Sequence, residues 1–234
     1  DGQTLHNHYH GNILQEGQLV LGDFGAQNSM CYAGDITRTC PVSSTFTAVQ
    51  KSIYEIVLKA EVDAINACKA GVKYKDVHLD AAKIISAGLK DLGLMKGNVD
   101  EAVAAGAHAL FFPHGLGHHI GLDVHDMEDL GEDLLGYDEN TKRSNQFGTR
   151  YLRLGKELEA GNVITVEPGI YFIPELIDQW RSEGKFNDFI NYDRLDALKS
   201  FGGIRIEDNI LIREEDSVIL GDPIPKQIAD IETL

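Results

Sequence analysis

Apolar positions repeat along the chain with two different periods, which predict strands near its start and helices after them. Residues 19–24 and 32–40 are apolar runs joined through polar residues 27–29, and together they predict a strand hairpin whose first strand is buried. Residues 49–68 and 77–92 place apolar side chains at helical spacing. Each of these two segments therefore predicts an amphipathic helix.

Capping residues mark the ends of the predicted helices. Thr47 is followed three residues later by Gln50, which predicts a capping box at the start of the first helix. Gly71 and Gly93 follow the two helical segments and predict where they end. Residues 98–107 predict a short third helix.

Glycine-punctuated apolar runs in the second half of the chain predict three more strands, over 111–124, 163–172 and 204–212. Two polar segments, 127–156 and 174–200, separate these runs. An order of strands, then helices, then strands predicts an α+β fold with an antiparallel sheet.

Composition narrows the class of protein. A chain of 234 residues forms one large or two small domains, and its net charge of −16 argues against nucleic acid and anionic membranes as partners. Three cysteines without a CxxC pair do not make a disulfide framework and favour a reducing, cytoplasmic setting. No segment resembles a signal peptide. The longest apolar stretch, 102–112, falls short of the ~20 residues that span a bilayer.

Charged and metal-binding residue types stand inside apolar segments at four places, where they are unfavourable unless paired or coordinated. Gathering four carboxylates without a cation would force some of them to take up protons. One histidine with four carboxylates suits Mn²⁺ first, with Zn²⁺, Co²⁺ or Fe²⁺ as alternatives. Four carboxylates indicate two ions, about 3.5–4 Å apart, that share a hydroxide nucleophile, as in a hydrolase. The five candidate ligands are Asp23, Asp35, His118, Glu167 and Glu207.

Strand parity gives three of these carboxylates a polar neighbour on the same face, which could orient it. Each candidate also has an ordinary explanation when taken alone. His114 and His118, for example, could be unrelated histidines. The joint occurrence in order favours the metal site. The neighbours are Thr37 for Asp35, Thr165 for Glu167 and Arg205 for Glu207; the ordinary roles are an Asp35–Arg38 pair, a turn at Glu167–Pro168, and an Arg205–Glu207 pair.

As a set, these motifs resemble the pita-bread metallopeptidases, a family that includes methionine aminopeptidase, aminopeptidase P and prolidase. The resemblance runs from about residue 5 to residue 212. It implies a curved, mostly antiparallel sheet with helices packed outside it, and residues 1–234 as one catalytic domain. The motifs that carry it are Asp23, Asp35-Ile-Thr-Arg-Thr, His114-Gly-Leu-Gly-His118, Thr165-Val-Glu-Pro-Gly and Ile204-Arg-Ile-Glu207.

The resemblance implies a role for each candidate residue. Asp23 would bind one metal ion, His118 and Glu167 the other, and Asp35 and Glu207 would bridge the two. Glu167 would also shuttle a proton from the attacking water towards the leaving nitrogen. Among the remaining residues, His125 would stabilise the tetrahedral intermediate, His114 would line the substrate pocket, and Arg205 would support the ligands and the substrate site.

The amino-acid sequences of these motifs are similar to those of the prolidase branch of the family, whose members cleave Xaa-Pro dipeptides. Arg153 lies where prolidases bind the C-terminal carboxylate of the dipeptide, and a bidentate clamp there would favour dipeptides; its ordinary explanation is an exposed surface arginine. We therefore expect an Xaa-Pro dipeptidase that acts on small peptides and is a homodimer in its longer form. The alternatives are an aminopeptidase P-like enzyme acting on longer peptides, and a non-catalytic binding module.

Three departures from the family pattern stand out. The two aspartates, Asp23 and Asp35, lie twelve positions apart rather than the usual eleven, which predicts a hairpin one residue longer. The substrate histidine is His6 by its distance to Asp23, or His8 by the following Tyr9, and we favour His6. Prolidases also carry an N-terminal domain and further helices before this point, so we expect a fragment without them.

Overall fold

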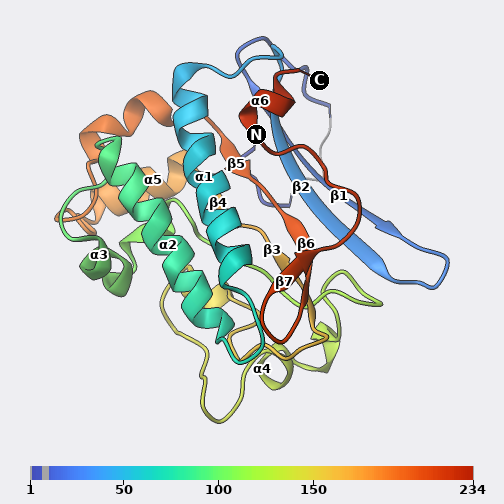
Figure 1. Cartoon of the computed structure of the whole chain (residues 1–234). Helices are drawn as coiled ribbons and strands as arrows, with labels where there is room; N and C mark the ends of the chain where they lie inside the picture. The colour runs from blue at the N-terminus through green and yellow to red at the C-terminus, as the bar shows by residue number, and fades with distance from the viewer. Residues whose placement is uncertain (1, 7–10, 234) are drawn as a thin grey trace.

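The computed structural model describes residues 2–6 and 11–233. Helices α1 and α2 lie side by side across the strands, and hairpin β1–β2 projects beyond the body of the molecule (Figure 1). The strands are β1 (Leu19–Gln27), β2 (Ala33–Pro41), β3 (Val163–Val166), β4 (Gly169–Tyr171), β5 (Gly203–Arg205), β6 (Asp208–Ile212) and β7 (Ser217–Ile219). The helices are α1 (Ala48–Ala67), α2 (Tyr74–Asp91), α3 (Val99–Ala105), α4 (Glu132–Leu135), α5 (Pro174–Ser182) and α6 (Ile228–Ile231).

All strand pairs within the described residues are antiparallel and form three small sheets. These sheets are β1–β2, β3–β6–β7 and β4–β5. Strand β2 contacts both β5 and β6, so the hairpin joins the two other sheets. The predicted α+β class with an antiparallel sheet is confirmed.

The predicted helices are confirmed, including the capping box. Gln50 donates its backbone N–H to the Thr47 hydroxyl at 3.3 Å, and the Gln50 side chain accepts from the Thr47 N–H at 2.8 Å. Helix α3 ends at Gly106, which adopts φ of 92° in the left-handed region that glycine tolerates. The buried faces of α1 and α2 contribute to one hydrophobic core with the strands.

The hairpin forms as predicted, with an unbroken register that pairs Asp23 with Thr37 and Gly25 with Asp35. Asp23 pairs directly with Thr37, and Asp35 lies two positions from Thr37 on the same strand, so Asp23 and Asp35 share a face without a bulge. The expectation of a buried first strand is wrong, because β1 is exposed from Asp23 onward and Phe24 is 68% exposed.

The strand predicted over 111–124 is wrong. A 3₁₀ turn (Ala107–Leu110) precedes an irregular segment that borders β3 through isolated contacts. Thr165 donates its N–H to the His118 carbonyl at 2.9 Å, and Glu167 donates to the Leu116 carbonyl at 2.8 Å. Gly117 lies against β3 so closely that an added Cβ would stand 2.1 Å from the Thr165 carbonyl oxygen. This close approach requires glycine at position 117. The His118 N–H donates to the Thr165 hydroxyl at 3.0 Å and not to a backbone carbonyl, which interrupts a regular strand ladder.

We expect Gly117→Ala to destabilise the protein by about 3 kcal/mol, because the new methyl group meets the Thr165 backbone, which cannot yield, and also the buried Tyr74 hydroxyl. Urea unfolding of the two proteins measures this loss. Gly34→Ala is the matched control, since its added Cβ would meet nothing closer than 3.7 Å. Equal unfolding midpoints for Gly117→Ala and Gly34→Ala would contradict the close approach.

Each of the two remaining predicted strands divides into two. The first breaks at Glu167 and Pro168, where proline has no N–H to continue the ladder. The second breaks at Ile206 and Glu207, and there the Glu207 N–H bonds across to the Thr37 carbonyl at 3.1 Å. Glu167 and Glu207 therefore both lie at interruptions between strands, outside the regular sheet.

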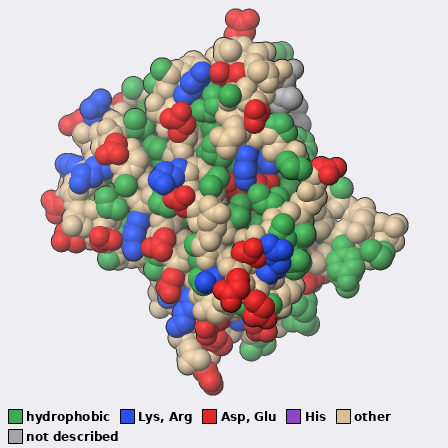
Figure 2. Space-filling view, in the orientation of Figure 1, with side chains coloured by type: hydrophobic (Ala, Val, Ile, Leu, Met, Phe, Trp, Pro, Cys, Tyr) green, Lys and Arg blue, Asp and Glu red, His purple; other side chains and the backbone are tan. Residues whose placement is uncertain are grey.

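The two polar segments hold short helices that the pattern did not predict. The first contains α4, and the second contains α5, which buries Ile177 and Trp180 against the core. Acidic side chains are spread over the face shown in Figure 2, together with fewer basic ones. Among the described residues, no helix has the length and apolar character needed to cross a membrane.

Candidate metal centre and active site

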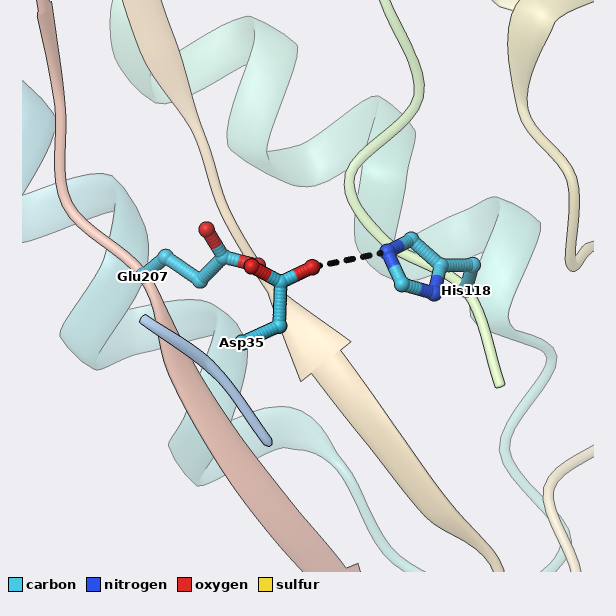
Figure 3. Close-up of side chains that lie close together, drawn as sticks. All are labelled: Asp35, His118 and Glu207. Atoms are coloured by element: carbon cyan, nitrogen blue, oxygen red, sulfur yellow. Dashed lines mark ion pairs between the residues drawn. The ribbon is translucent and has the colours of Figure 1, made fainter. Parts of the chain in front are cut away.

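Three segments that are distant in sequence bring a carboxylate, an imidazole and a second carboxylate together. Asp35 comes from β2, His118 from the irregular segment, and Glu207 from the break between β5 and β6. One potential ligand atom from each lies within 4.8 Å of the others. The three side chains point towards one another (Figure 3), and His118 Nε2 is 3.6 Å from Asp35 Oδ2.

The hydrogen bonding of His118 leaves one ring nitrogen free to bind a cation. Its Nδ1 lies 2.9 Å from the His119 carbonyl, which can only accept, so Nδ1 carries the proton. Nε2 then presents its lone pair towards Asp35 and towards Glu167 Oε1 at 3.5 Å. A backbone carbonyl that fixes the tautomer in this way is typical of metal-binding histidines.

Burial and crowding of carboxylates raise their pKa values in the absence of a cation. Burial raises the pKa of Glu167 to about 8, with a contribution from Asp35 that Arg205 opposes. Burial, together with the charges of Glu167 and Asp35, also raises the pKa of Glu207. Burial raises the pKa of Asp35, but the neighbouring His118, Asp23 and Arg205 outweigh it, so the pKa of Asp35 is lowered. The cluster thus holds excess negative charge that a cation would neutralise.

An unsatisfied atom supports the same conclusion. Glu207 is buried, and its Oε2 accepts a hydrogen bond from the Thr37 hydroxyl at 2.6 Å. Its Oε1 is buried without a hydrogen-bond partner among the described residues. A carboxylate oxygen left this way is unfavourable unless something binds it. Hard oxygen donors with one imidazole fit a divalent cation such as Mn²⁺ or Zn²⁺.

Arg205 connects the ligands from the outside of the cluster. Its Nη2 donates to Asp23 Oδ2 at 2.5 Å, and its Nε donates to the Thr37 hydroxyl at 3.0 Å. The Thr37 hydroxyl therefore connects Arg205 to Glu207. The sequence pattern instead predicts that Thr37 orients Asp35. Thr165 contacts Glu167 as expected, with its hydroxyl 3.3 Å from Oε1.

Arg38 does not neutralise Asp35. Its guanidinium instead pairs with Asp208 at 2.6 Å, away from the cluster. The Arg205 Nε lies 3.9 Å from Glu207, at the outer limit of an ion pair. Of the ordinary explanations, the Asp35–Arg38 pair is therefore wrong.

Tyr171 is a buried member of the site that the sequence did not single out. Its hydroxyl accepts from Arg205 Nη1 at 3.1 Å and lies 3.0 Å from His114 Nε2. His114 Nδ1 bonds to the Gly115 carbonyl at 2.7 Å, so both ring nitrogens are engaged. Tyr171 is one of several fully buried aromatic residues, and no signal in the sequence separates it from the others.

His125 and Arg153 lie on the other side of the site, next to the segment 127–135. The His125 ring centroid is 4.5 Å from that of His118, and its Nδ1 is 3.0 Å from Glu128 Oε2. Burial lowers the pKa of His125 to about 4. Arg153 is half-buried and pairs with Glu128 and Glu132, so it is not the exposed surface arginine of the ordinary explanation.

All ten predicted site residues line one cavity of about 470 Å³. His6 is exposed and borders this cavity, whereas His8 and Tyr9 lie outside the described residues. The ten are His6, Asp23, Asp35, His114, His118, His125, Arg153, Glu167, Arg205 and Glu207.

Solved structures share this architecture. Zinc-substituted aminopeptidase P of Escherichia coli in complex with product superposes with a TM-score of 0.78 at 35% identity, over 99% of this chain and 44% of that one. Aminopeptidase PepP of Pseudomonas aeruginosa superposes at 0.75 with 32% identity, over 99% of this chain and 44% of that chain. The fold is thus the pita-bread fold of aminopeptidase P.

Sequence relatives carry two names. The Phaeosphaeria nodorum protein named "Probable Xaa-Pro aminopeptidase PEPP" is 41% identical over 100% of this chain and 48% of its own length. The human Xaa-Pro dipeptidase is 38% identical over 94% of this chain and 43% of its own length. The chain thus spans about half the length of the relatives it matches or less. Residues 1–214 match the sequence profile of metallopeptidase family M24. The site and the match agree that this chain belongs to metallopeptidase family M24.

Proposed function

We propose that the chain is the catalytic part of a two-metal peptidase that cleaves the bond before proline in Xaa-Pro dipeptides. The observation that carries the proposal is the common cavity shared by the five candidate ligands and Arg153. The ligands supply a place for divalent ions, and the guanidinium supplies a partner for a substrate carboxylate. We favour Mn²⁺ for the metal, as the donor set is rich in carboxylate oxygen.

In this proposal Asp23, Asp35, His118, Glu167 and Glu207 would hold the two ions. Such a pair of divalent ions, when bound, lowers the pKa of water and polarises the scissile carbonyl.

The chain's own residues move the proton and position the substrate. Glu167 lines the cavity, and in this proposal its carboxylate takes a proton from the attacking water and passes it to the proline nitrogen. His125 lies beside His118 and contacts the oxyanion as it develops. Arg205 and Tyr171 hold Asp23 and His114 in place through their hydrogen bonds.

The second candidate is an Xaa-Pro aminopeptidase that acts on longer peptides. The names of the Phaeosphaeria relative and of the solved structures support it. Proline in either substrate has no amide N–H, so the site would accept the ring by shape. What separates the two candidates is whether the group after proline is a carboxylate or another peptide bond.

Hydrolysis of Ala-Pro and Ala-Pro-Ala by the Mn²⁺-treated protein separates these candidates. We expect kcat/KM to be higher for Ala-Pro, because only the dipeptide places its carboxylate beside Arg153. Arg153→Ala should remove that preference while leaving turnover of Ala-Pro-Ala. A higher kcat/KM for Ala-Pro-Ala, insensitive to Arg153→Ala, would favour the aminopeptidase.

A further inference from the structure

Arg153 is held by two carboxylates from the segment 127–135. Its Nη1 contacts Glu128 Oε1 and lies 3.0 Å from Glu132 Oε1. Its side chain keeps 32% of its surface exposed, so the guanidinium is still open to the cavity that it lines. The group proposed to bind a substrate carboxylate is therefore already paired with acidic side chains of the protein.

Both acidic side chains are also held by a second partner. Glu128 Oε2 lies 3.0 Å from His125 Nδ1. Glu132 Oε2 lies 2.6 Å from Arg143 Nη2, and the Arg143 Nε in turn lies 2.5 Å from Asp133. Arg143 as well as Arg153 therefore orients the Glu132 carboxylate.

Acidic side chains outnumber basic ones next to Arg153. Arg143 is matched by Asp133, which leaves Glu128 and Glu132 against the one positive charge of Arg153. A dipeptide would bring a third carboxylate to the same guanidinium. Repulsion between like charges weakens with distance and with solvent screening. It therefore acts most on a carboxylate that follows proline directly, and less on the more distant end of a longer peptide.

We infer that Glu132 is a specificity-determining residue that weakens binding of a substrate carboxylate at Arg153. Glu132 acts through Arg153 and does not itself touch the reacting atoms. It thereby sets the balance between dipeptides and substrates that carry an amide after proline. The inference rests on the proposed function, since it concerns the substrate of the same site.

Glu132→Gln tests this inference, with Asp133→Asn as the matched control. Both variants remove one negative charge from α4, and both residues contact Arg143, but within the described part of the chain only Glu132 of the two pairs with Arg153. Steady-state kinetics use the Mn²⁺-treated protein with Ala-Pro and with Ala-Pro-amide, which lacks the carboxylate. We expect Glu132→Gln to lower KM for Ala-Pro about fivefold relative to Ala-Pro-amide. Asp133→Asn should change this ratio less than twofold.

Equilibrium binding of the same two compounds by calorimetry gives a readout that does not depend on turnover. Tighter binding of Ala-Pro relative to its amide in Glu132→Gln supports the inference. An unchanged ratio, or weaker binding of Ala-Pro, would overturn it and leave Glu132 as a residue that only holds Arg153 in place. Absence of hydrolysis in every protein would defeat the proposed function, while the binding ratio would still decide the inference.

Discussion

Glu207→Gln should abolish metal binding and peptidase activity together. Glu207 is one of the proposed metal ligands, and its Oε1, which has no hydrogen-bond partner among the described residues, would be free to bind an ion. An amide keeps the size of the side chain but loses its charge and half of its acceptor capacity. We expect less than one tenth of the wild-type metal content and a fall in kcat/KM of about 10³-fold or more. Elemental analysis and Ala-Pro hydrolysis measure the two effects.

Loss of folding must be separated from loss of metal in this variant. Burial and neighbouring carboxylates raise the pKa of Glu207, so its charge at neutral pH opposes folding of the metal-free protein. Glu207→Gln should therefore melt no lower than wild type in EDTA. Glu215→Gln makes the same chemical change at an exposed site and serves as the control. Full metal content in Glu207→Gln would remove Glu207 from the ligand set.

We expect the His125→Ala variant to retain its metal content but to lose most of its kcat. His125 lies beside His118 but is outside the proposed ligand set, so its removal leaves the donor atoms in place. Loss of one group that stabilises an oxyanion lowers kcat by about 10²- to 10³-fold. We expect KM for Ala-Pro to change little, since the contact forms mainly in the transition state.

Metal content and kcat of His125→Ala are measured on the same preparation. A kcat within a few-fold of wild type would show that the assigned role of His125 is wrong. Loss of metal together with rate would instead place His125 among the ligands.

The helices and the hairpin could be predicted from sequence because their signals are local. Thr47 and Gln50 cap α1 through their own backbone, and the spacing of Asp23 and Asp35 is even, as a regular ladder requires. Strand parity also places Thr165 beside Glu167, and the structure agrees.

The breaks in the strands could not be predicted, because they depend on partners far away in the chain. Glu207 leaves its strand to bond Thr37 of β2, and Gly117 lies against Thr165 of β3. No local pattern encodes either contact. The pairing of Arg153 with Glu128 and Glu132 depends in the same way on a polar segment without regular periodicity. Tyr171 could not be found for the same reason, because the contacts of its hydroxyl with Arg205 and His114 are both long-range.

The most direct test of the central claim is release of proline from Ala-Pro by the protein before and after metal removal. The proposed site predicts no release after treatment with EDTA, and recovery when Mn²⁺ is added back to the same sample. Undiminished release from the metal-free protein would contradict the account. The account would also be contradicted if no proline were released in the presence of Mn²⁺, Zn²⁺ or Co²⁺.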